Sequence, residues 1–120
     1  MKILVADDSR VMRQIVIRTL RQAGYDDHEI VEAEDGADAL AKVGSEKPDL
    51  ILSDWNMPNM TGIECLQALR SSGSDVPFGF VTSEGSPEMR EKAANAGAMF
   101  LIAKPFNEDT FKEHLDGVIA

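Results

Sequence analysis

Four apolar runs in the sequence are each followed directly by polar side chains that could do chemistry. Asp7 and Asp8 follow the first of these runs, Asp54 follows the next, and Thr82 and Lys104 follow the last two. Three carboxylates brought together repel one another, so a proton or a cation must join them. Oxygen ligands favour a hard cation such as Mg²⁺. A carboxylate can also attack phosphorus, while an ammonium group and a hydroxyl hold the remaining phosphoryl oxygens.

Each of these side chains also has an ordinary structural explanation. Asp8 or Ser9 would serve as a helix N-cap, and Asp54 would suit a turn. Thr82 is β-branched and fits the end of a strand, and Lys104 would be a solubilising charge. None is distinctive alone. Their joint occurrence after different predicted strands favours a phosphoryl or metal site.

The elements that must position these residues alternate along the whole chain. The five apolar runs are residues 2–6, 29–33, 49–53, 76–81 and 99–103, and the helix-like stretches are a first one ending at Gly24, then 36–44, 61–71, 87–96 and 107–119. Four runs are almost continuously apolar, as strands covered on both faces are, whereas 29–33 alternates and indicates an edge strand. The pattern predicts an α/β fold with a five-stranded parallel sheet and helices on both faces. Ligands of such sheets bind beyond the carboxyl ends of the strands.

Composition narrows the class of protein and its partners. The chain has 120 residues, 43% of them hydrophobic, and its formal net charge is −9. This balance predicts one folded domain and disfavours nucleic acid or an anionic membrane as a partner. Cys65 is the only cysteine, which excludes an internal disulfide, and no apolar run is long enough to span a membrane. We therefore expect a cytoplasmic domain. Gly79, inside run 76–81, indicates close packing by a neighbour.

Four segments resemble the signature blocks of response-regulator receiver domains, and in particular those of single-domain chemotaxis regulators. They read ILVADDS (3–9), LILSDWNMPNMTG (50–62), FVTSE (80–84) and AGAMFLIAKPF (96–106). The resemblance covers residues 1–120 and implies a (βα)5 flavodoxin-like fold with strand order 2-1-3-4-5. It also implies a receiver domain without an output domain.

The resemblance implies a role for each candidate residue. Asp54 would accept a phosphoryl group from a histidine kinase, and Asp7, Asp8, Asp54 and the backbone carbonyl of Asn56 would bind Mg²⁺. Thr82 and Lys104 would contact phosphoryl oxygens, and the Lys104–Pro105 peptide bond would be cis. The chain would act as a monomer on a downstream protein, such as a flagellar motor switch, and would catalyse only its own phosphorylation and dephosphorylation.

Three further positions concern lifetime and switching. Asn56 and Glu84 stand two residues after Asp54 and Thr82, where the family places side chains that orient the hydrolytic water, so we expect rapid autodephosphorylation. Leu101 stands three residues before Lys104, where the family often has an aromatic switch residue. Phe100 precedes it, and strand alternation places that side chain on the opposite face.

Two other classes of protein share parts of this pattern. An Mg²⁺-dependent phosphatase with an aspartyl nucleophile also begins from an aspartate at a strand tip. Its second aspartate follows two residues later in the first strand, whereas Asp54 is followed by Asn56 in the third. A flavodoxin that binds FMN needs a phosphate loop after the first strand, where Asp7 and Asp8 would repel the phosphate.

Overall fold

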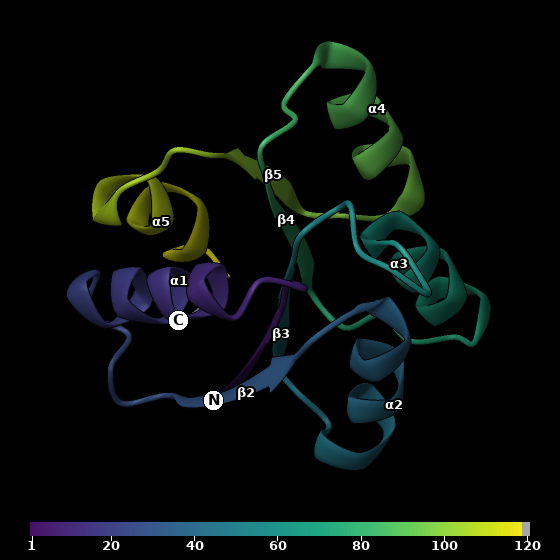
Figure 1. The fold of residues 1–120 in the computed structure, drawn as a ribbon, viewed down its shortest axis with the longest axis horizontal. Helices are drawn as coiled ribbons and strands as arrows, with labels where there is room; N and C mark the ends of the chain where they lie inside the picture. The colour runs from purple at the N-terminus through teal and green to yellow at the C-terminus, as the bar shows by residue number, and fades with distance from the viewer. Residues whose placement is uncertain (119–120) are drawn as a thin grey trace.

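The fold is a parallel sheet between two layers of helices. The computed structural model describes residues 1–118. Its elements are β1 (Lys2–Ala6), α1 (Arg10–Gln22), β2 (Glu29–Ala33), α2 (Gly36–Glu46), β3 (Leu50–Ser53), α3 (Gly62–Ser71), β4 (Phe78–Thr82), α4 (Pro87–Ala96), β5 (Phe100–Ala103) and α5 (Glu108–Leu115). The described strands are parallel in the order β2-β1-β3-β4-β5. Helices α1 and α5 cover one face, and α2, α3 and α4 cover the other (Figure 1). This is the predicted flavodoxin-like order, with β2 at an edge.

The strand boundaries differ slightly from the prediction. β1 and β2 have the predicted ends, whereas β3, β4 and β5 begin one or two residues later, and β4 continues to Thr82. Pro77 has no N–H to donate to the ladder, which delays the start of β4. Asp49 lies just before β3, where its amide donates to the Lys2 carbonyl at 2.7 Å and its carboxylate accepts from the Lys2 amide at 2.8 Å.

The helices begin at capping residues, and two of them end away from the predicted positions. Ser9 is the N-cap of α1, and Thr61 caps α3 in a capping box with Glu64. α2 continues to Glu46, past the predicted end at residue 44. α5 ends at Leu115, so its predicted extension through residues 116–118 is wrong, and the predicted end at 119 lies outside the described residues.

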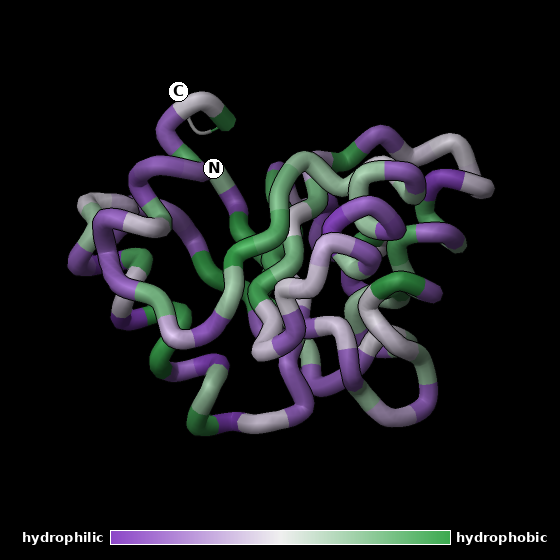
Figure 2. Tube along the Cα trace, turned by 90° about the horizontal axis from the view of Figure 1, so that it is seen from above, coloured by the Kyte–Doolittle hydropathy of each residue, from purple (hydrophilic) through white to green (hydrophobic). Residues whose placement is uncertain are grey.

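Strand alternation divides the apolar residues into two cores. Ile3 and Val5 of β1 face α1 and α5, whereas Leu4 and Ala6 face the other three helices. In the chain trace, hydrophobic segments gather toward the middle of the molecule (Figure 2). Cys65 is buried in the second core, as a small apolar residue would be.

Gly79 is explained by the ring of Phe100 on the neighbouring strand. The two residues are paired between β4 and β5, and a Cβ at position 79 would lie 2.1 Å from the Phe100 ring atom Cε1. This confirms the predicted close packing.

Within residues 1–118, no helix has the length and apolar character needed to cross a membrane.

Candidate functional site

The carboxyl ends of β1 and β3 bring three aspartates together. Ala6 and Ser53 are paired in the sheet, so the residues that follow them leave the sheet side by side. Asp7, Asp8 and Asp54 each offer a carboxylate oxygen, and these oxygens lie within 4.8 Å of one another. The structure therefore unites the predicted carboxylates in one cluster.

Asp7 is held by four contacts, which leaves Asp8 as the exposed member of the cluster. The Asp7 amide donates to the Ala33 carbonyl at 3.1 Å, and its carboxylate accepts from the Ser9 amide at 2.9 Å. Arg13 donates to the Asp7 carbonyl at 2.6 Å, and the fourth contact is with Lys104. The residue Asp7 is 3% exposed, whereas Asp8 reaches solvent.

Asp54 stands at the tip of β3 in a partly desolvated position. Its amide donates to the Ala6 carbonyl at 2.9 Å, and its Oδ1 accepts from the Trp55 amide at 2.8 Å. Burial raises the pKa of the Asp54 carboxyl above its ordinary value, Lys104 opposes that shift, and Asp7 adds to it. A desolvated carboxylate beside another carboxylate needs a cation, which suits a nucleophile that works with a metal.

The ends of β4 and β5 supply the cation and the hydroxyl. Lys104 Nζ lies 3.3 Å from Asp7 Oδ2 and 3.8 Å from Asp54 Oδ2. The Lys104 amide donates to the Thr82 carbonyl at 2.8 Å, and Thr82 is fully buried. The Lys104–Pro105 bond is cis, as expected. All five predicted residues thus lie at the same edge of the sheet.

Asn56 and Glu84 contact each other at the rim of the site. The Asn56 side-chain amide donates to Glu84 Oε1 at 3.0 Å, and both residues are exposed. They join the loop after β3 to the loop after β4. Trp55 and Met57, the neighbours of Asn56, are buried in the second core and act in packing.

The Leu101 side chain lies on the face of the sheet that is covered by α2, α3 and α4, and the Phe100 side chain packs on the opposite face. The sequence reasoning missed Arg90 of α4, which reaches across to this strand. Arg90 Nη1 donates to the Leu101 carbonyl at 3.1 Å, and its Nε donates to the Gly85 carbonyl at 3.1 Å. Nothing in the spacing of Arg90 distinguishes it from other exposed arginines.

A second missed contact joins the loops after β2 and β3. Residues 54–61 after β3 form the acceptor loop. Asn59, in this loop, donates a hydrogen bond from its side chain to Asp35 Oδ2 at 2.7 Å. Asp35 follows β2 and is the N-cap of α2, and Asn59 has a φ of 65°. An asparagine in a tight loop is the available signal, because this residue tolerates the left-handed region.

The donor set fits a divalent cation. The cluster offers only carboxylate oxygens, which hard divalent ions prefer. The partial burial of Asp54 and the near-complete burial of Asp7 leave uncompensated negative charge beside a single ammonium group. An aspartate triad of this kind is typical of the divalent metal site of receiver domains.

Comparison with known proteins establishes the family. The sequence pattern described as the response regulator receiver domain matches residues 3–116. The chain therefore belongs to the receiver domain family, whose members are not classical enzymes. This assignment favours a signalling module over an aspartyl phosphatase or a flavodoxin.

Several chemotaxis proteins are similar to this chain over nearly their whole length. Chemotaxis protein CheY1 of Helicobacter pylori is 38% identical over 122 residues, covering 99% of this chain and 97% of that protein. The CheY homolog of Campylobacter jejuni is 40% identical and covers 99% and 92%. The crystal structure of CheY4 from Vibrio cholerae is 41% identical, with a TM-score of 0.85 and coverage of 98% of both chains.

Proposed function

We propose that this protein is a phosphorylation-driven response regulator of the chemotaxis type, with Asp54 as the phosphoryl acceptor. The observation that carries the proposal is the convergence of Asp7, Asp8 and Asp54 with Lys104 at one edge of the sheet. Membership of the receiver family implies a histidine kinase as the phosphodonor. Relatives named as chemotaxis proteins, at 38% to 41% identity, support the pathway.

Asp54 acts as the nucleophile in this mechanism. One of its carboxylate oxygens attacks the phosphorus of the phosphohistidine, and the P–N bond breaks with its electron pair leaving on the imidazole. The product is an acyl phosphate on Asp54. The Lys104 ammonium is placed to hold one phosphoryl oxygen, and the Thr82 hydroxyl to hold another.

The metal in this proposal is Mg²⁺, bound by Asp7, Asp8, Asp54 and the backbone carbonyl of Asn56. When bound, Mg²⁺ neutralises charge that develops on the transferred phosphoryl group. The protein's own part is to fix the carboxylates: the Ser9 amide orients Asp7, and the Trp55 amide orients Asp54.

The residues at the ends of β4 and β5 would transmit the phosphorylation signal to a partner protein. Thr82 and the Leu101 position are proposed to relay phosphorylation to a separate downstream protein, such as a flagellar motor switch, in the cytoplasm. Residues 1–120 form the receiver domain and act as a monomer. Asn56 and Glu84 flank the path of the hydrolytic water and keep the phosphorylated state short-lived.

Incubation with acetyl phosphate and MgCl₂ followed by mass spectrometry tests the acceptor. The wild type should gain one phosphoryl group on Asp54, and Asp54→Asn should gain none while keeping its fold. Asp75→Asn, which changes an exposed aspartate in the loop before β4, is the matched control and should be labelled normally. Full labelling of Asp54→Asn at another residue would refute the assignment. Sustained turnover of a simple phosphoester such as p-nitrophenyl phosphate would favour the phosphatase alternative.

A further inference from the structure

The acceptor loop is held at its outer end by the loop after β2. Asp35 Oδ2 accepts a hydrogen bond from the Asn59 side-chain amide at 2.7 Å. Next to it, the Gly36 amide donates to the Met60 carbonyl at 3.0 Å. The two backbones are in close contact here, because a Cβ on Gly36 would lie 2.3 Å from the Met60 oxygen.

Asp35 makes this contact as a buried, fully bonded carboxylate. Its Oδ1 accepts from the Asp38 amide at 2.7 Å and so caps α2, and the residue is 7% exposed. The Asp38 amide and the Asn59 side chain lower the pKa of Asp35, so the group stays ionised. A hydrogen bond to an ionised acceptor is stronger than one between neutral groups. Asp35 thus ties the acceptor loop directly to the start of a helix.

Asn59 adopts a backbone conformation in which its side chain has a specific use. Its φ of 65° lies in the left-handed region, where glycine is less strained than any L-residue. The amide side chain is used to reach Asp35. At its inner end the same loop is closed by the Gly62 amide, which donates to the Trp55 carbonyl at 2.8 Å. Asn56 therefore lies between two anchored ends.

We propose that the Asp35–Asn59 hydrogen bond is a positioning contact for divalent metal binding at the Asp7–Asp8–Asp54 cluster. The contact fixes the loop that carries Asn56 and follows Asp54. Asp35 and Asn59 touch neither metal nor phosphoryl group, so both are positioning residues. The inference rests on the proposed function, because it assigns these residues to the same site.

Two single substitutions remove the contact and still allow the local backbone conformation at each position. Asn59→Gly preserves the left-handed conformation without the amide. Asp35→Ser keeps an N-cap for α2, but its hydroxyl is too short to reach Asn59. With Mg²⁺ as the only ligand, calorimetry and Trp55 fluorescence should show affinity reduced by roughly tenfold in each variant.

An exchange of the two side chains provides the rescue. Asn59→Asp alone puts a second carboxylate against that of Asp35. The repulsion should weaken Mg²⁺ binding as well. Combining it with Asp35→Asn restores one donor and one acceptor, and retains a cap for α2, so affinity should return to within about twofold of the wild type. The double-mutant cycle measures the contact itself. If each substitution only damaged the fold, the second one would not restore Mg²⁺ affinity.

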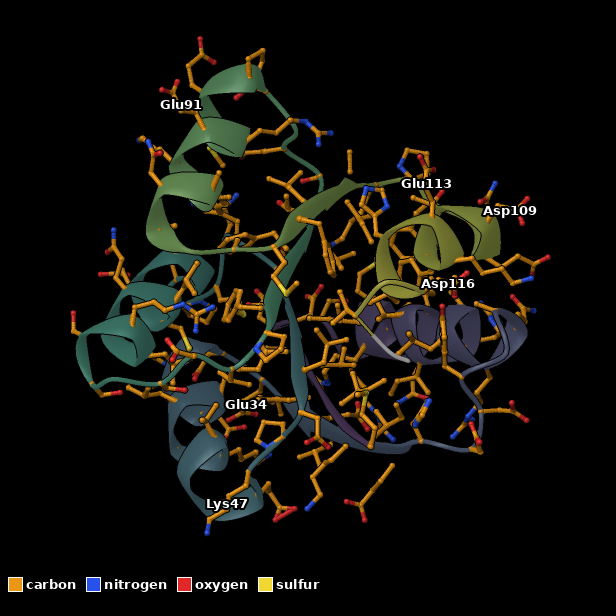
Figure 3. All side chains as sticks on the ribbon, turned by 180° about the vertical axis from the view of Figure 1, so that it is seen from behind. Glu34, Lys47, Glu91, Asp109, Glu113 and Asp116 are labelled. Atoms are coloured by element: carbon orange, nitrogen blue, oxygen red, sulfur yellow. The ribbon has the colours of Figure 1, made fainter. Side chains whose placement is uncertain are left out.

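Lys47→Gly is the matched backbone control. Lys47 is the other described non-glycine residue with a positive φ, at 49°, and it ends α2. It lies at the far end of α2 from Glu34, the neighbour of Asp35 (Figure 3). Its replacement should leave Mg²⁺ affinity unchanged.

The outcomes separate this inference from the proposed function. Wild-type Mg²⁺ affinity in Asn59→Gly and Asp35→Ser would overturn the positioning role, and so would lower resistance to urea with unchanged affinity. Failure of the exchanged pair to recover affinity would also overturn it. If the wild type binds Mg²⁺ and the variants lose affinity, but Asp54 is never phosphorylated, the proposed function fails and the positioning contact stands.

Discussion

The two halves of the site differ in what holds them. In the acceptor half, which comprises Asp7, Asp8 and the acceptor loop, backbone hydrogen bonds attach Asp7 and Asp54 to neighbouring strands. In the output half, which comprises residues 82–86, Leu101 and Lys104, the loop after β4 depends mainly on side chains. The Glu84 amide makes only a 3.4 Å contact with the Thr82 hydroxyl, the Glu84 carboxylate accepts from the Asn56 side chain, and the Arg90 side chain donates to the Gly85 carbonyl.

This difference separates a rigid element from a deformable one. The acceptor half must keep oxygens in place for a metal, and backbone contacts with buried partners resist displacement. In the proposed mechanism the output half changes when Asp54 is phosphorylated, and a loop held by exposed side chains opens at low free-energy cost.

Glycine substitutions beside the two halves should have unequal effects on stability, because Gly62 directly follows the acceptor loop and Gly79 lies on β4, the strand that leads into the output half. A Cβ on Gly62 would lie 2.1 Å from the Asp54 carbonyl oxygen, which cannot move without shifting the acceptor loop. A Cβ on Gly79 would lie 2.1 Å from the Phe100 ring, which can rotate. Gly62→Ala should lower the free energy of unfolding by about 3 kcal/mol and Gly79→Ala by about 1 kcal/mol.

Urea unfolding measures both values, with a rescue for the second. In a Phe100→Leu background the Gly79→Ala change should be almost neutral, because the ring that it meets is gone. A larger loss for Gly79→Ala than for Gly62→Ala would contradict the contrast between the halves.

Removal of Asp8 should affect the metal and leave the fold intact. Asp8 is exposed, so Asp8→Ala removes a proposed metal ligand without leaving a cavity. Loss of an outer-shell partner typically reduces metal affinity tenfold or more, so loss of a direct ligand should reduce Mg²⁺ affinity by at least about tenfold. Calorimetry should show this change for Asp8→Ala and none for Asp75→Asn, which changes the exposed aspartate in the loop before β4. Equal affinity for Asp8→Ala and the wild type would remove Asp8 from the site.

The sequence predicted the acceptor half better than the output half for a physical reason. Asp7, Asp8 and Asp54 follow apolar runs whose direction is set by the parallel sheet, so their meeting follows from topology. The Arg90 contact of the output half depends on how α4 lies against β5. Within the acceptor half, the Asn59 contact was missed for the same reason, because it depends on how one loop lies against another. Side chains of this kind have no periodic signature.

The ends of the elements show the same limit. Pro77 shortens β4 because it lacks a donor, and this effect is readable from the sequence once the ladder is known. The end of α5 at Leu115 is set by local capping at Asp116, against an apolar pattern that suggested continuation. Local chemistry at an end overrides the periodicity of the whole element.

Arg90 should stabilise the loop after β4 without affecting the metal. Its guanidinium joins the Gly85 and Leu101 carbonyls, and it is exposed, so its net contribution is about 1 kcal/mol. Arg90→Leu should therefore raise amide hydrogen exchange in residues 83–86 by roughly fivefold. Lys92→Leu, on the same helix, is the control. It should change neither the hydrogen exchange of residues 83–86 nor the Mg²⁺ affinity. Faster exchange around Asp54 in Arg90→Leu would show that the two halves are not separable.

The lifetime of phosphorylated Asp54 should depend on a side-chain contact that joins the two halves, in addition to the contacts of Lys104 with Asp7 and Asp54. Asn56 belongs to the acceptor loop and Glu84 to the loop after β4, and their hydrogen bond of 3.0 Å lies at the exposed rim. An amide and a carboxylate there can both orient an attacking water. Asn56→Lys and Glu84→Leu should each slow dephosphorylation a few-fold, the effect of an orienting hydrogen bond worth about 0.5–1 kcal/mol. Decay of the phosphorylated protein after donor removal measures the rate, with Asn95→Lys on α4 as the control. Because the two side chains contact each other, the double variant should decay more like the slower single variant than like the product of both effects. Unchanged decay in both single variants would mean that neither side chain guides the water, and the basis for a rapidly reset signal would be lost.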